Sequence, residues 1–244
     1  IAAGSALLYK YGKVVEQIKE LFPKVYKASF IIEGDTPTEM AKSTGLAIIE
    51  LSNIFDYSRP DIVLTIADRY ETIATAIAAS YMNIPLAHTQ GGELTGSIDE
   101  SVRHSITKLA HIHFPSTKAA RKNLIQMGED AENIILSGCP SIDLALEAEK
   151  FFDPNIDLFN LYGGSGQNLE WDKEFLVVLQ HPVTTSYEST LKQIEETIKA
   201  VLDQRMQVAW LWPNVDAGSD IISKRLREIK NHSENKLDSL ETSS

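Results

Sequence analysis

Short apolar runs alternate with stretches whose apolar positions repeat at helical spacing. The expected strands are residues 61–66, 84–88, 111–114, 133–138, 175–181 and 208–212, with helical patterns at 70–82, 118–128, 187–203 and 219–230 and another after Ser97. Apolar strands with little polar alternation are buried on both faces, and helical crossovers make neighbouring strands parallel. The pattern therefore predicts an α/β fold built on doubly wound parallel sheets.

One stretch breaks this rhythm. Residues 147–173 contain Pro154 and three glycines, which are typical of a linker between lobes. The "GGSG" in this stretch lacks the Lys-Ser/Thr ending and the following helix of a phosphate loop, which favours a flexible turn over a nucleotide site. We expect a Rossmann-like lobe over residues 1–150, a hinge over 151–172 and a second, incomplete Rossmann-like nucleotide-binding lobe over 173–244.

Charge and cysteine content narrow the class of protein. The net charge of −11 over 244 residues argues against nucleic acid or an anionic membrane as a bulk partner. The single cysteine, Cys139, cannot form an intrachain disulfide, which favours a reducing, cytoplasmic setting. The apolar runs are much shorter than the ~20 residues of a membrane helix, and the N-terminus lacks the basic start of a secretory signal.

Polar side chains gather where the expected strands end. In parallel α/β sheets, ligands bind outside the carboxyl ends of the strands. The polar residues at these ends are Asp68, Arg69, His88, Gln90, Glu93, His181, Asn214 and Asp216. We expect them to face one crevice between the lobes.

The stretch "HTQGGELTGSIDESVRH", residues 88–104, permits a purely local explanation for much of its charge. Ser97 and Glu100 match the S-x-x-E capping box, and Asp99 also favours a helix N-terminus. The pairs Asp99–Arg103 and Glu100–His104 have the spacing of side-chain pairs one helical turn apart. These features predict a helix that begins after Ser97, whatever the function.

Helix chemistry does not explain the residues that precede this cap. Glu93 lies in the loop, and Gly91-Gly92 would let the backbone approach a ligand closely. A carboxylate at a helix N-terminus has its charged form stabilised, so Asp99 suits the role of a base or a charge stabiliser. These residues indicate a site in the loop.

Other candidates have two balanced interpretations. Asp68-Arg69 could be a helix cap with a surface arginine, or a carboxylate with a phosphate-reading guanidinium. His181, held before Pro182, could be structural or could act as an acid or phosphate donor. The histidines of "HIH" (111–113) fall on opposite faces of an expected strand, so no metal site is predicted.

The segments "ADRYETIATAIAASYMNIPLAHTQGGELTGSIDESVRHSITKLAHIHF", "LSGCPSID", "VVLQHPVTT" and "WPNVDAGS" carry a family resemblance. At these residues the chain resembles the hydrolysing UDP-N-acetylglucosamine 2-epimerases of the sialic-acid and legionaminic-acid pathways. The resemblance implies a two-lobed, glycosyltransferase-B-like fold with a UDP-sugar substrate in the cleft. It also implies a homodimer and a reaction that needs neither a metal nor another cofactor.

The resemblance further implies a reaction and roles for particular residues. UDP would be eliminated across C1–C2 to give a glycal, and water would then add to give a free 2-epimeric sugar such as N-acetylmannosamine. The implied catalytic residues are Asp68, Asp99, Glu93 and His181. The implied substrate-binding residues are Arg69, Gln90, Gly91, Gly92, Arg103, Asn214, Asp216 and Ser219.

The chain departs from the family pattern in two respects. Gln90 occupies a position that many relatives give to a catalytic glutamate, and glutamine cannot take the C2 proton. The proton would then pass to another carboxylate, or the enzyme would act on UDP-N,N'-diacetylbacillosamine. The family's T-G-T-R-A-E loop, which follows its first strand, and its S-S-x-G-I-R-E clamp are absent from residues 1–244, so we expect weak or no turnover from these residues alone.

Three alternatives to this function stay open. A glycosyltransferase could use the same cleft, but it would need an acceptor. A non-hydrolysing epimerase would keep its product linked to the nucleotide. A non-catalytic module would bind the nucleotide sugar without converting it.

Overall fold

The structure is a computed structural model of the chain. It describes residues 1–9, 14–34, 36–151, 153, 156, 169–170, 173–213 and 216–229. The chain divides into two compact units, Ile1–Lys150 and Phe151–Ser244.

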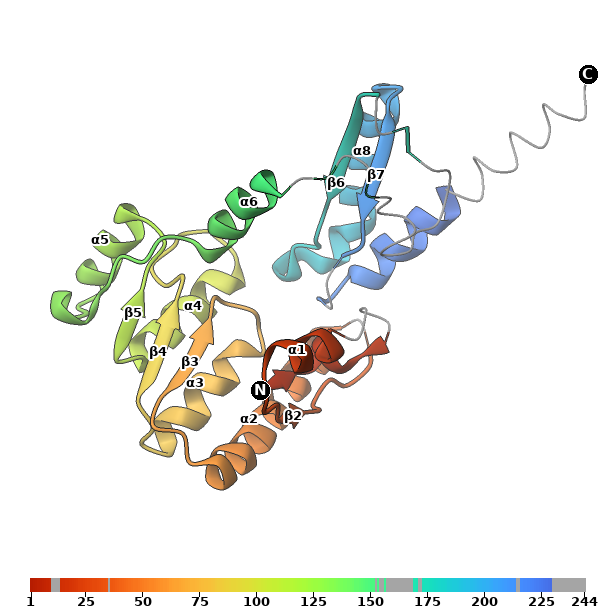
Figure 1. The fold of residues 1–244 in the computed structure, drawn as a ribbon. Helices are drawn as coiled ribbons and strands as arrows, with labels where there is room; N and C mark the ends of the chain where they lie inside the picture. The colour runs from red at the N-terminus through yellow and green to blue at the C-terminus, as the bar shows by residue number, and fades with distance from the viewer. Residues whose placement is uncertain are drawn as a thin grey trace, which may run out of the picture. The chain divides into compact units, whose positions relative to one another are not determined.

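A parallel sheet forms the centre of the first unit (Figure 1). Its strands are β3 (Val63–Ile66), β4 (Leu86–Thr89) and β5 (Ile112–Phe114), in the order β3-β4-β5. Both strand pairs are parallel, as the apolar pattern predicts. The expected strand at 133–138 is reduced to one parallel bridge between Ile134 and His113.

Three helices follow the three strands in turn. They are α3 (Thr72–Tyr81), α4 (Ile98–Leu109) and α5 (Lys118–Gln126), close to the predicted positions. Helix α3 buries Ala74, Ala76, Ala78 and Ala79. These small side chains allow close packing, and they belong to the same core as Leu86 of β4. Each strand therefore ends in a turn that leads directly into a helix.

The N-terminal residues form elements that the apolar pattern did not predict. They are β1 (Ala2–Ala3), the 3-10 helix η1 (Gly4–Leu7), α1 (Val15–Leu21), β2 (Lys27–Ala28) and α2 (Pro37–Ser58). Strands β1 and β2 pair in parallel. In α2, the Thr36 hydroxyl accepts from the amide of Thr38, Pro37 occupies the first turn, and Leu51 and Phe55 are buried. This long helix extends the core around α3.

The end of the first unit adds a short 3-10 helix, η3 (Ala131–Asn133), and α6 (Pro140–Lys150). Helix α6 takes up the first four residues of the stretch 147–173. Most of the expected hinge, including Pro154 and the "GGSG" at 163–166, lies outside the described residues. The hinge therefore stays a prediction.

The second unit has a parallel pair of strands, β6 (Phe175–Leu179) and β7 (Gln207–Leu211). Between them lie a 3-10 helix, η4 (Thr184–Ser189), and α8 (Thr190–Asp203), and a further helix covers residues 219–229. The core of this unit joins Ile194 and Ile198 of α8 to Ile222.

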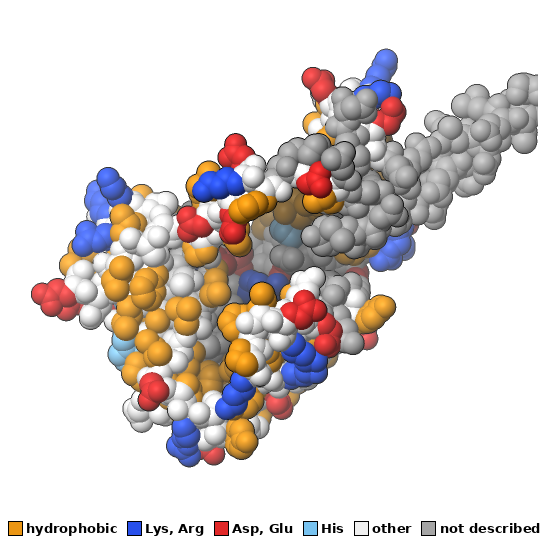
Figure 2. Space-filling view, in the orientation of Figure 1, with side chains coloured by type: hydrophobic (Ala, Val, Ile, Leu, Met, Phe, Trp, Pro, Cys, Tyr) orange, Lys and Arg blue, Asp and Glu red, His pale blue; other side chains and the backbone are white. Residues whose placement is uncertain are grey.

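Charged side chains of both signs are interspersed with apolar ones on the visible surface (Figure 2). The exposed apolar residues include Leu64 and Ile66 of β3, whereas Val63 and Thr65 on the same strand are buried. None of the described helices is both long and apolar enough to cross a bilayer.

Candidate functional site

The turn after β3 carries Asp68 and Arg69, as predicted. Ala67 adopts the left-handed conformation, with φ of 55°, and its amide donates to the carbonyl of Thr89 on β4. The N-cap of α3 is Glu71, so the interpretation of Asp68 as a helix cap is wrong. Instead, the Asp68 side chain points toward α4.

Asp68 forms an ion pair with a buried arginine of α4. The Arg103 side chain is only 4% exposed, and it donates to the Asp68 carboxylate and, at 2.7 Å, to the carbonyl of Glu93. Burial lowers the pKa of Arg103, but a guanidinium stays charged in proteins. Among the described residues no ion pair joins Asp99 to Arg103, so that expected pair is wrong: Arg103 turns inward to the more distant Asp68.

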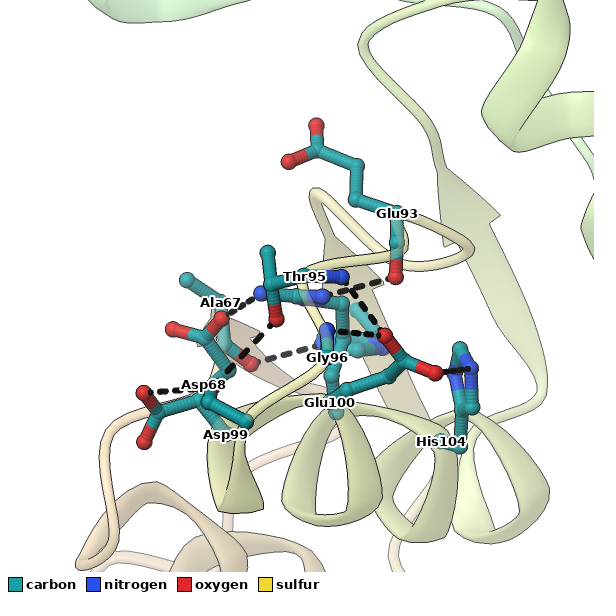
Figure 3. Close-up of polar contacts among 11 residues, drawn as sticks. Ala67, Asp68, Glu93, Thr95, Gly96, Asp99, Glu100 and His104 are labelled. Atoms are coloured by element: carbon teal, nitrogen blue, oxygen red, sulfur yellow. Dashed lines mark hydrogen bonds and ion pairs between the residues drawn. The ribbon is translucent and has the colours of Figure 1, made fainter. Parts of the chain in front are cut away.

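The Glu100 side chain binds the backbone of the loop before α4, rather than the amide of the N-cap residue Ser97 (Figure 3). Its carboxylate accepts from the amides of Thr95 at 2.6 Å and Gly96 at 2.7 Å, and these bonds lower its pKa. The expected pair with His104 is confirmed, with Glu100 Oε1 and His104 Nε2 3.8 Å apart. Ser97 is the N-cap residue, but its hydroxyl caps no backbone amide. The reciprocal capping box is therefore not formed.

The two candidate aspartates are brought to one face of α4. Asp99 accepts from the Ser97 hydroxyl at 3.1 Å, and it lies one helical turn before Arg103, the partner of Asp68. Figure 3 shows the Glu93 side chain pointing away from this cluster, while its carbonyl faces Arg103. Asp68 and Asp99 thus lie near the first turns of α4, whereas the Glu93 side chain points away from them.

Packing alone accounts for the two glycines of the loop. A Cβ on Gly91 would lie 3.0 Å from Nδ1 of His88 and 3.1 Å from the Thr107 hydroxyl. A Cβ on Gly92, which has φ of 83°, would lie 2.4 Å from the carbonyl oxygen of Ala120. Their expected contact with a substrate stays a prediction, because close protein neighbours already require both glycines.

Arg69 faces an acidic neighbour that the sequence did not single out. Its Nε lies 3.1 Å from a carboxylate oxygen of Glu71, and its side chain is 36% exposed. Within the described part of the chain, the buried Nη2 of Arg69 has no hydrogen-bond partner. This nitrogen is a donor that an anionic ligand could use.

Gln90 contacts a second residue that sequence reasoning missed, Cys139. Gln90 is left-handed, with φ of 59°, and its Nε2 lies 3.7 Å from the sulfur of Cys139. Hydrogen bonds from the amides of Ile142 and Ser141, at the start of α6, lower the pKa of the Cys139 thiol, and Gln90 adds to this effect. In the motif "LSGCPSID", Pro140 signals the helix start that follows Cys139, but not the contact with Gln90.

The second unit carries the remaining candidates on the loops after its two strands. His181 follows β6, and the amide of Asp216 donates to the hydroxyl of Ser219 at 3.2 Å. A Cβ on Gly218 would lie 3.0 Å from Pro182, so the two loops are in contact. His181, Asp216 and Ser219 therefore share one end of this small sheet, whereas Asn214 lies outside the described residues.

Comparison with known protein families gives a match over nearly the whole chain. Residues 1–243 match the family described as UDP-N-acetylglucosamine 2-epimerase. A Legionella pneumophila protein named UDP-N,N'-diacetylbacillosamine 2-epimerase (hydrolyzing) is 35% identical over 91% of this chain and 57% of its own length. A Campylobacter jejuni protein named GDP/UDP-N,N'-diacetylbacillosamine 2-epimerase (hydrolyzing) is 33% identical over 82% of this chain and 50% of its own length. The chain thus spans little more than half of these relatives.

Solved structures agree on the fold. The UDP-GlcNAc 2-epimerase of Methanocaldococcus jannaschii, crystallised with UDP-GlcNAc and UDP, has a TM-score of 0.68 and 21% identity over 95% of this chain and 59% of its own. The Neisseria meningitidis enzyme bound to UDP-GlcNAc has a TM-score of 0.65 and 19% identity over 87% of this chain and 58% of its own. The predicted α/β, glycosyltransferase-B-like fold is confirmed, and the chain belongs to the UDP-N-acetylglucosamine 2-epimerase family.

Proposed function

We propose that the chain is the sugar-handling part of a hydrolysing UDP-sugar 2-epimerase. The observation that carries this proposal is the pair of carboxylates, Asp68 and Asp99, on one face of α4 in a chain of this family. In the proposed reaction the bond from C1 to the UDP oxygen breaks, C2 loses its proton and a C1=C2 double bond forms. Water then adds its oxygen to C1, and C2 takes up a proton on the opposite face.

The two carboxylates suit different parts of this reaction. The C2 proton of a sugar is barely acidic, so departure of UDP leads and positive charge builds at C1. Asp68 is already paired with Arg103, which suits it to electrostatic stabilisation rather than proton transfer. Asp99 accepts only a hydroxyl among the contacts described, and we assign it the role of base. A well-placed base contributes roughly 10²–10⁴-fold to the rate.

Each unit, taken by itself, carries donors that suit a diphosphate. In the first unit, Arg69 offers an unpartnered Nη2 among the described residues. In the second unit, His181 follows β6, and the loop at 216–218 leads into the helix at 219–229, whose N-terminus favours an anion. These groups are proposed to neutralise the departing UDP, and His181 to protonate it.

We propose a diacetamido-dideoxy sugar as the substrate, with UDP-N-acetylglucosamine as the alternative. Two relatives that are 35% and 33% identical are named for diacetylbacillosamine. An Escherichia coli relative that is 33% identical is named for polysialic acid biosynthesis, and the Neisseria meningitidis relative named for N-acetylglucosamine is 29% identical. Gln90 is compatible with this choice, because its amide both donates and accepts hydrogen bonds and so suits the additional, 4-acetamido group of such a sugar.

Proton NMR in D₂O tests the proposal directly. The natural protein that carries this sequence is incubated with UDP-N,N'-diacetylbacillosamine and, separately, with UDP-N-acetylglucosamine. We expect a released sugar with deuterium at C2 and free UDP, formed faster from the first substrate. Asp99→Asn should lower kcat by roughly 10²–10⁴-fold, whereas the exposed Asp56 on α2 provides the control Asp56→Asn, which should leave kcat unchanged.

Other outcomes would identify the alternatives. UDP release that depends on an added acceptor would indicate a glycosyltransferase, and a product that stays linked to UDP would indicate a non-hydrolysing epimerase. Binding of UDP in calorimetry without any product would indicate a sensing module. Sedimentation equilibrium would test the homodimer that the family resemblance implies.

A further inference from the structure

A buried histidine lies directly beneath the turn that carries Asp68. His88 is 0% exposed, and its Nε2 lies 2.9 Å from the carbonyl oxygen of Ala67. Ala67 is a left-handed residue without the freedom of glycine, so its conformation needs outside support. That support comes from β4 alone among the contacts described: Thr89 accepts from its amide and His88 binds its carbonyl.

The protonation of the ring is fixed by its surroundings. Burial lowers the pKa of His88 to about 4, so the ring is neutral at neutral pH. Because a carbonyl can only accept, Nε2 must carry the hydrogen. Nδ1 is then an acceptor, and the Thr107 hydroxyl lies 3.4 Å from it on α4. Gly91 closes the space beside the ring, since a Cβ there would touch Nδ1 at 3.0 Å.

The partners of Asp68 and of His88 lie on one face of α4. Asp99, Arg103 and Thr107 follow at intervals of four residues and so lie along the same side of the helix. Arg103 binds the Asp68 carboxylate, and Thr107 binds the ring that holds the preceding residue, Ala67. The position of Asp68 relative to Asp99 is therefore set at two points along α4.

We propose that His88 is a positioning residue for Asp68: by donating to the Ala67 carbonyl and accepting from Thr107, it sets where the Asp68 carboxylate stands beside Asp99. His88 does not touch the substrate in this role and transfers no proton. The consequence for turnover rests on the proposed function, but the positioning of Asp68 does not.

The neighbouring strand supplies a matched control. His113 is the register partner of His88 on β5 and is 1% exposed. Its Nε2 lies 3.2 Å from a carboxylate oxygen of Glu129, and none of the described contacts joins its side chain to Ala67 or Asp68. Replacing His113 therefore removes the same side chain from the same sheet without removing the support of Ala67.

Carbon-13 NMR of the labelled 244-residue chain tests the proposal without any need for turnover. We expect His88→Leu to move the Ala67 carbonyl and Asp68 carboxylate resonances by several linewidths. His88→Gln, which can keep an N–H near the position of Nε2, should restore most of both shifts. His113→Leu should lower the thermal midpoint but leave both resonances in place. Unmoved resonances in His88→Leu, or equal movement in His113→Leu, would overturn the proposal.

Two further measurements keep the outcome decisive. If His88→Leu does not fold, Thr107→Val replaces it; both resonances should still move, and unmoved resonances would count against the proposal. In the natural protein, His88→Leu should lower kcat by roughly 10²-fold with little change in KM, because misplacing a catalytic group costs about that much. Absence of turnover in the unsubstituted protein would contradict the proposed function, while the carbon-13 result would still decide the role of His88.

Discussion

Two polar networks involve neighbouring strands, and they differ in whether their carboxylate stays accessible to a ligand. The Asp68 network joins His88 to Ala67 and Thr107, and Asp68 to Arg103 and the carbonyl of Glu93. The Glu129 network joins His113, Glu129 and Lys108, with one carboxylate oxygen for each partner.

The two networks differ in how fully their carboxylates are occupied. The Glu129 carboxylate is 12% exposed and both of its oxygens are occupied, so this network is closed. In the Asp68 network the histidine is neutral, its described partners are neutral oxygens, and the Asp68 side chain stays 22% exposed. A buried histidine can thus occupy a carboxylate oxygen or support a turn, and here only the second arrangement leaves the carboxylate partly exposed.

The largest expected difference comes from removing the cation of each network. Arg103→Met should lower the free energy of unfolding by about 2–4 kcal/mol, since it leaves Asp68 and the Glu93 carbonyl without their donor. Lys108→Met should cost only about 0.5 kcal/mol, because Lys108 is 54% exposed. Urea unfolding of the two variants compares them directly, and equal losses would erase the distinction between the networks.

The next expected effect is a pH dependence of stability. The pKa of His88 falls from 6.5 in the unfolded chain to about 4 in the folded one, mainly through burial. Between these values the unfolded chain binds more protons, so stability is lost as pH falls, by about 3 kcal/mol in all. His88→Gln should remove this loss from urea titrations between pH 7 and pH 4.

His113 sharpens the same measurement. Burial also lowers the pKa of His113, while Glu129 opposes the shift. His113→Gln should therefore flatten the pH profile less than His88→Gln. A larger effect of His113→Gln would show that His113, and not His88, has the larger pKa shift on folding.

A smaller effect is expected from Gly91, which packs against the His88 ring. Gly91→Ala should cost about 1–2 kcal/mol, because its Cβ would force His88 and Thr107 apart by a few tenths of an ångström. Gly45 in α2 is the control: a Cβ there meets no atom within 4 Å, so Gly45→Ala should be stabilising by about 0.5–1 kcal/mol. Thermal unfolding measures both.

The smallest expected effect concerns Cys139, which contacts Gln90 in the loop after β4. The pKa of its thiol is lowered chiefly by amides of α6 and less by Gln90. Gln90→Ala should therefore slow alkylation by iodoacetamide at neutral pH, but only modestly. Gln126→Ala, at the end of α5, should leave the rate unchanged; an unchanged rate in Gln90→Ala would argue against the contact.

The sequence was most informative where structure is local. The strands β3 to β7 and the helices α3, α4, α5 and α8 follow the apolar spacing, because burial on a strand or helix repeats at a fixed interval. Helix α2 was missed, although Thr36 followed by Pro37 is a helix-start signal. Burial on α4 does not follow residue type alone: Ile106 is buried, but so are Arg103 and Thr107, while Ile98 is 42% exposed.

The pairings of the site were less predictable. The sequence expected Arg103 to bind Asp99 and Glu100 to complete a capping box, since both partners lie nearby in the chain. In the structure Arg103 binds Asp68, 35 residues away, and Glu100 binds the amides of Thr95 and Gly96. Spacing along a helix lists possible partners, but burial and loop path choose among them.

By itself, the sequence determined the α/β class, the strand end that carries Asp68, the helix start that carries Asp99, and the motifs of the family, because these depend on residue type and short-range periodicity. Only the tertiary structure decided that His88 contacts the Asp68 turn while His113 contacts the Glu129 carboxylate. The two histidines occupy equivalent positions on neighbouring strands, and what separates their roles is the set of atoms that folding places around each ring.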